Sequence, residues 1–131
     1  MKVADARKIM DAAKKQAVAM DKAVSIIVVD AAGIPILLDK NGEPGAFTSV
    51  VAEGKAAASA FTGRDSAMLA QMAERVPALI GALGTRLGGR FVALQGAVVL
   101  MRDGDIVGAV GVSGATSEED EQIAKAGAAA L

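Results

Sequence analysis

Apolar residues recur at helical spacing near the amino terminus and give way to β-branched runs. Residues 3–20 place alanine, isoleucine and methionine on one face of a helix, with lysine and aspartate on the other. Residues 24–30 (VSIIVVD) are typical of a central strand. The turn Ala31-Ala32-Gly33 leads into 34–39 (IPILLD), which we expect to pair back as the second arm of a hairpin.

The middle of the chain predicts helices. An alanine-rich segment over residues 48–61 predicts a second helix, which Gly63 ends. Asp65 or Ser66 is placed to cap a third helix that runs to about residue 75. Pro77 either begins a further short helix or bends the third one.

The last third of the chain predicts strands and a closing helix. Residues 91–94 and 97–102 have strand character, and Asp103-Gly104 is a strong hairpin signal before a last strand over 106–112. Residues 116–131 predict the closing helix. Hairpins dominate, so we expect one α+β domain over residues 1–131, with a largely antiparallel sheet and helices packed against it.

The junction between the last strand and the closing helix is the most distinctive segment. Glycines at 108, 111 and 114 allow a backbone or a ligand to approach closely. Thr116 or Ser117 precedes Glu119 or Asp120 by the three residues of a capping box. Free N–H groups at such a helix start favour an anion, whereas the run of acids over 118–121 offers a competing explanation by satisfying that end.

The residue types that are missing restrict the chemistry. The chain has no histidine, cysteine, tryptophan or tyrosine, which excludes imidazole bases, thiolate nucleophiles and His- or Cys-based metal sites. Any catalysis must use Asp, Glu, Lys, Arg, Ser, Thr or the backbone. Any haem would have to accept a methionine or oxygen ligand, or bind without a strong axial bond.

Composition restricts partners and location. The net charge is −1, from 14 basic and 15 acidic residues, and aromatic residues make up 2%, so we expect no nucleic-acid partner. No apolar run approaches the roughly 18 residues of a membrane span, and the amino terminus lacks an apolar signal core, so we expect a cytoplasmic protein without membrane attachment. An apolar content of 53% in so short a chain favours a homo-oligomer.

Three blocks of sequence resemble a known family. IIVVDAAGIPILLDKNG (26–42), GKAAASAF (54–61) and IVGAVGVSGATSEEDEQIAKAG (106–127) look like the HbpS/GlcG-like group of small haem-binding and glycolate-operon proteins. The same domain forms the carboxy-terminal part of PduO-type cobalamin adenosyltransferases. The resemblance implies a profilin-like fold, with a five-stranded antiparallel sheet flanked by helices. It also implies homo-oligomers, from dimers to octamers, that bind small ligands, haem among them.

Two features of haem-binding relatives have no counterpart here. Ligation of haem by histidine cannot carry over, because the chain has no histidine. The iron-binding pair of acids has no clear match, since Glu118 and Glu121 lie in the first helical turn, where the helix dipole explains them. We therefore expect no metal site and regard haem as a possible rather than an established cofactor.

Lys55 is the leading candidate for chemistry, because it stands among small residues and the resemblance places a lysine there. If it is buried it needs a carboxylate, for which Asp120 and Asp30 are the best candidates, although Asp30 is better explained as a turn residue. These three are the candidate catalytic residues. The candidate ligand-binding residues are Lys55, Ser113, Gly114, Ala115, Arg64 and Arg90.

Two functions remain open. The first is an oligomeric binding protein whose pocket takes a small anionic or haem-like ligand. The second is a cofactor-independent enzyme for a small hydroxy or oxo metabolite, in which Lys55 acts as base or electrostatic stabiliser. Met68 and Met72, four residues apart, either line a pocket or, as we expect, pack in the core.

Overall fold

The computed structural model describes all residues, 1–131, and contains five helices and one four-stranded antiparallel sheet. The α+β class predicted from the sequence is therefore confirmed. In chain order the elements are α1 (Val3–Ala19), β1 (Val24–Asp30), β2 (Pro35–Asn41), α2 (Thr48–Thr62), α3 (Ser66–Arg75), α4 (Pro77–Arg86), β3 (Ala97–Arg102), β4 (Asp105–Ser113) and α5 (Ser117–Ala128).

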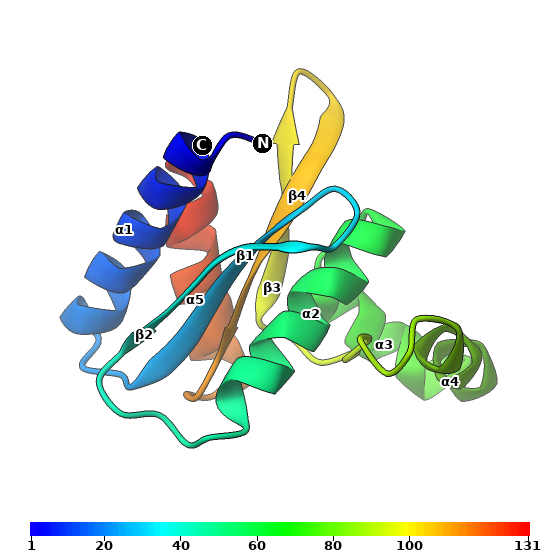
Figure 1. The fold of residues 1–131 in the computed structure, drawn as a ribbon. Helices are drawn as coiled ribbons and strands as arrows, with labels where there is room; N and C mark the ends of the chain where they lie inside the picture. Colours follow the sequence, from blue (N-terminus) through cyan, green and yellow to red (C-terminus); the bar gives the residue numbers. More distant parts are fainter.

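The sheet has the order β2-β1-β4-β3 and lies between two layers of helices (Figure 1). Helices α1 and α5 cover one face, and α2 covers the other, with α3 and α4 beyond it. Ile26 and Val28 point into the cluster with α1 and α5, whereas Ile27 and Val29 point into the cluster with α2. Strand β1 is therefore apolar on both faces over residues 26–29, which explains the run of β-branched residues there.

The predicted fifth strand is not formed. Residues 91–94 lie in an irregular segment that crosses α2 on the side away from the sheet. The Val92 amide donates to the carbonyl of Gly54 over 3.1 Å, and the Phe91 ring packs with Ala58 and Leu69. The apolar residues that suggested a strand are therefore buried against a helix, and the backbone bonds to that helix instead of to a neighbouring strand.

Helix α2 is small-residue-rich because it is enclosed on both sides. A Cβ at Gly54 would collide with Val92 of the crossing segment, and a Cβ at Gly111 of β4 would collide with the Ala52 carbonyl oxygen of α2. The helix and the sheet therefore approach more closely than larger side chains would allow. This close approach brings the middle of α2 next to the carboxyl end of β4.

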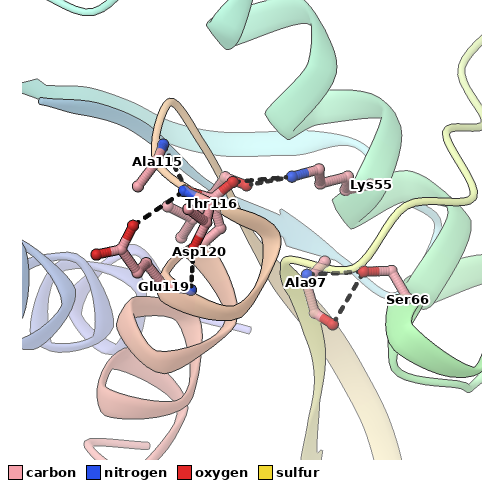
Figure 2. Close-up of polar contacts among 8 residues, drawn as sticks. Lys55, Ser66, Ala97, Ala115, Thr116, Glu119 and Asp120 are labelled. Atoms are coloured by element: carbon pink, nitrogen blue, oxygen red, sulfur yellow. Dashed lines mark hydrogen bonds and ion pairs between the residues drawn. The ribbon is translucent and has the colours of Figure 1, made fainter. Parts of the chain in front are cut away.

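The start of α3 covers the free edge of β3 instead of capping its own helix. The Asp65 carboxylate makes no capping bond and accepts the Val99 amide over 2.9 Å. The Ser66 hydroxyl accepts the Ala97 amide over 2.8 Å and also contacts the Ala97 carbonyl, as Figure 2 shows. These side chains occupy backbone groups that a neighbouring strand would otherwise pair.

The other predicted elements agree with the structure to within about three residues at their ends, and Pro77 begins α4 rather than bending α3. None of the helices is both long and apolar enough to cross a bilayer.

Candidate functional site

At the junction of β4 and α5, side chains of the junction itself accept the free backbone N–H groups at the start of the helix. Thr116 and Glu119 form a capping box, in which each side chain accepts the backbone N–H of the other residue over 3.2 Å. The Asp120 carboxylate accepts the Ala115 amide over 2.9 Å (Figure 2). The sequence left open whether these N–H groups bind an external anion or the acids of residues 118–121. In the structure, acids of the chain itself accept from them.

Lys55 and Asp120 form a buried ion pair at this junction. The Lys55 Nζ lies 3.1 Å from Oδ2 of Asp120 and donates to the Val112 carbonyl over 3.0 Å (Figure 2). The two residues are 3% and 2% exposed. Burial raises the pKa of Asp120 above its usual range, while the Ala115 amide and the Lys55 ammonium act in the opposite direction.

The space around this pair is filled. A Cβ at Gly96 would lie 2.6 Å from the Lys55 Nζ and 2.9 Å from the Val112 carbonyl oxygen. Ser113 is buried and Gly114 is exposed, and neither lines one of the two cavities of the structure. The predicted partnership of Lys55 with Asp120 is thus present, in a packed interior.

Asp30 lies at the other end of the sheet. In the pairing of β1 with β4 it faces Gly108, whereas Ser25 faces Ser113. The Asp30 carboxylate accepts the amides of Ala32 and Ile34, each over 2.9 Å. Asp30 is therefore the turn residue that the sequence favoured, and the structure does not bring it together with Lys55.

Arg90 connects the segment that crosses α2 to α2 itself and to the β1–β2 turn. Its Nε donates to the Glu53 carboxylate over 2.9 Å, and its Nη2 donates to the Gly33 carbonyl of the β1–β2 turn. The guanidinium therefore links three parts of the chain, and its remaining exposure is partial. Arg90 lines neither of the two cavities of the structure.

Arg64 lines the larger of the two cavities, a groove of about 510 Å³ on one side of α3. Met68 and Met72 follow it at four-residue intervals, and Arg75 and Val76 complete the lining. Met68 is 49% exposed, so the expectation of core packing is wrong for this residue. Met72 is partly buried and packs against the cluster of Ala58, Leu69 and Phe91. We refer to this cavity as the α3 groove.

Sequence reasoning did not single out Arg75, although the signal was present. Met68, Met72 and Arg75 follow one another at intervals of four and three residues, which places them on one face of α3, and Arg64 precedes the helix by two residues. A cation at each end of an apolar stripe is a pattern that pairs with anionic, largely apolar ligands.

The second cavity, about 230 Å³, lies between α1 and β2 and has mixed charge. Its neighbour Lys14 bonds to Asp39 over 2.7 Å, which lowers the pKa of that carboxyl. The lining residues are Arg7, Met10, Asp11, Leu37, Leu38 and Asp39.

Acidic side chains do not gather into a metal site. No group of three or more aspartates and glutamates lies close enough together to hold an ion. Glu121, one of the two acids with E-x-x-E spacing, bonds to Lys125 over 2.8 Å, and Glu118 is exposed.

Comparison with solved structures finds close matches over the entire chain. The crystal structure of a PduOC:heme complex matches with a TM-score of 0.90 and 27% identity, covering 100% of this chain and 94% of that one. The protein ORFY of Klebsiella pneumoniae matches with a TM-score of 0.89 and 25% identity, covering 100% and 92%. A double mutant of HbpS from Streptomyces reticuli matches with a TM-score of 0.88 and 26% identity, covering 100% and 86%.

A search of curated protein sequences finds no match. The family model described as "Haem degrading protein HbpS-like" matches residues 1–129. The chain therefore belongs to the HbpS-like family.

Proposed function

We propose that this protein binds a flat, largely apolar ligand with carboxylate substituents, of the tetrapyrrole class that includes haem, in the α3 groove. The observation that carries the proposal is the lining of the groove, with Arg64 and Arg75 at its ends and two methionines between them. The proposal keeps the small-molecule binding function expected from the sequence. It moves the ligand from the β4–α5 junction to α3.

The chemistry of the groove suits such a ligand. Guanidinium groups pair with carboxylates through two parallel hydrogen bonds, and thioethers make favourable contacts with aromatic rings. An arginine at each end allows the carboxylate edge to be paired whichever way the macrocycle lies. A volume of about 510 Å³ falls within the usual range for small-molecule sites. The solved haem complex of a related protein supports the same ligand class.

The donor set is compatible with an iron-bearing macrocycle. The chain has no histidine, cysteine or tyrosine, but thioethers are established axial ligands of haem iron, and two of them line this groove. Bound haem would supply an iron centre, and the residues of the chain would hold the macrocycle and its carboxylates.

The environment of Lys55 supports binding over catalysis at that residue. Its ammonium already bonds to Asp120 and to the Val112 carbonyl, and only 3% of the residue is exposed. A general base must reach the proton that it abstracts, and Lys55 has no cavity beside it that a substrate would enter. We therefore propose a structural role for this pair.

We also propose that the protein is a homo-oligomer. Phe47 and Phe61, two of its three phenylalanines, are 69% and 50% exposed, and Val50 beside Phe47 is exposed as well. Apolar side chains of this size are commonly covered by a partner subunit. Native mass spectrometry of the purified protein measures the subunit number and any retained ligand together, and a monomer at all concentrations would contradict this part of the proposal.

Fluorescence titration with metal-free protoporphyrin IX tests the ligand site. We expect saturable binding that weakens about ten-fold, or about 1.4 kcal/mol, in the double variant Arg64→Ala/Arg75→Ala. Arg86→Ala is the matched control, because Arg86 is exposed at the end of α4 and does not line the groove. Equal affinity of the double variant and the control would refute the site.

A further inference from the structure

We propose that Met68 supplies the axial thioether ligand when the tetrapyrrole in the α3 groove carries iron. This inference rests on the proposed function and deepens it, because it names a residue that makes the site selective for an iron-bearing ligand. Three observations carry it: which donors exist in the chain, which of them reach the groove, and which of those is free.

The first observation is the narrow choice of donors. Among the strong nitrogen and sulfur ligands of haem iron, histidine and cysteine are absent, which leaves the thioethers of six methionines. The groove is lined by no lysine, carboxylate or hydroxyl that would compete. The two arginines that line the groove do not compete either, because a guanidinium group is a hydrogen-bond donor with no acceptor lone pair for iron.

The second observation is that only two of the six methionines lie in the groove. Met68 and Met72 line it, while Met10 lines the second cavity. Met1 and Met20 pack against the core cluster under α1 and α5, and Met101 lies exposed on β3. The donors that reach the proposed ligand are thus two neighbours on one face of α3.

The third observation separates these two neighbours. Met72 packs against the cluster of Ala58, Leu69 and Phe91, so its side chain forms part of the wall. Met68 is 49% exposed and packs against none of the core clusters. Its flexible side chain can therefore turn toward a ligand without opening the core.

A thioether ligand has a measurable consequence for the iron. Thioether sulfur is a soft donor, so it stabilises ferrous iron relative to ferric iron and raises the reduction potential of the haem. Replacement of Met68 by leucine keeps the apolar volume but removes the sulfur, so Met68→Leu isolates ligation from packing.

The experiment compares wild type, Met68→Leu, Met72→Leu and Met101→Leu after loading with haem. Magnetic circular dichroism detects the thioether-to-iron charge-transfer band, and potentiometric titration gives the reduction potential. We expect Met68→Leu to lose the band and to shift the potential downward, whereas Met72→Leu and Met101→Leu keep both properties of the wild type. Retention of the band in Met68→Leu, or its loss in Met72→Leu, would overturn the assignment.

Binding of metal-free protoporphyrin IX distinguishes the failure of this inference from the failure of the proposed function. That ligand has no iron, so we expect Met68→Leu to weaken its binding no more than Met72→Leu does, because each replacement removes one thioether from the lining of the groove. If protoporphyrin binds in the groove but the haem spectrum is unchanged by Met68→Leu, only the axial assignment fails. If protoporphyrin binding is independent of Arg64 and Arg75, the proposed site itself fails and the axial assignment fails with it.

Discussion

The ammonium nitrogen of Lys55 lies 3.1 Å from the carboxylate of Asp120, in a position where both residues are almost fully buried. The pair joins the middle of α2 to the first turn of α5, and the Lys55 ammonium donates a second hydrogen bond to the Val112 carbonyl of β4. Two helices on opposite faces of the sheet are thus joined at the end of the sheet where β4 finishes. A charge pair in this environment matters most when one member is removed, because the other is then left unpaired.

Removing only one of the two charges should therefore destabilise the folded protein. We expect Lys55→Met and Asp120→Asn each to lower the free energy of unfolding by about 3–5 kcal/mol. The double variant Lys55→Met/Asp120→Asn should cost clearly less than the sum, because no buried charge remains. Urea denaturation of the four proteins measures this double-mutant cycle. Strictly additive costs would show that the two residues stabilise the fold independently.

The Lys55→Met variant should also have a distinctive pH dependence. Burial raises the pKa of Asp120, so the folded state favours the protonated acid relative to the unfolded chain. The contribution of Asp120 to stability is therefore greatest at low pH and falls as the pH rises through its folded-state pKa. Without Lys55 this loss should become larger, so the gap between variant and wild type widens from acidic to neutral pH. Urea midpoints across that range provide the check, and a constant gap would exclude an ionised Asp120 as the cause.

Glu119 should contribute in the opposite sense. Its ion pair with Lys22 (3.0 Å) lowers the pKa of this carboxyl, helped by the Thr116 amide. The contribution is therefore present above the unfolded-state pKa and is lost as the pH falls through the folded-state pKa. Glu119→Gln keeps an acceptor for the capping box but removes the charge. We expect this variant to be less stable than wild type at neutral pH and equal to it in acid; thermal melts at the two pH values would reveal any other pattern.

The close approach of α2 to β4 predicts a contrast between two glycines. In Gly111→Ala the new methyl group collides with the Ala52 carbonyl and the Ala56 side chain, so we expect a loss of about 1–3 kcal/mol. Gly81 in α4 has open space around the same position, so Gly81→Ala should stabilise by about 0.8–1 kcal/mol. Urea denaturation measures the free energy of unfolding of both variants. No loss of stability in Gly111→Ala would mean that α2 and the sheet move apart easily to accept the methyl group.

Much of the fold follows from local signals in the sequence. The Asp103-Gly104 turn, the capping box from Thr116 to Glu119 and the period of α1 each specify a structure within a few residues. The prediction of a strand over residues 91–94 is wrong for a physical reason. An apolar segment shows that it is buried, but not whether its backbone will bond to a strand or, as Val92 does, to a helix carbonyl.

The sequence predicts less of the candidate site than of the fold. The need of a buried Lys55 for a carboxylate correctly indicated Asp120, because an unpaired interior charge is too costly to persist. The α3 groove depends on which face of α3 the rest of the fold leaves uncovered, which is a tertiary property. The spacing of Met68 and Met72 is the same whether they are buried or open to a ligand, so periodicity alone could not separate the two interpretations.

Carbon-13 labelling of the methionine methyl groups offers the most direct test of the central claim, that a tetrapyrrole binds in the α3 groove. The six methyl signals, assigned through Met→Leu variants, report on both cavities, since Met68 and Met72 line one and Met10 lines the other. On addition of metal-free protoporphyrin IX, the ring current should shift the signals of Met68 and Met72 and leave the other four in place. A shift of Met10 alone, or binding that leaves Met68 and Met72 unmoved, would contradict the account.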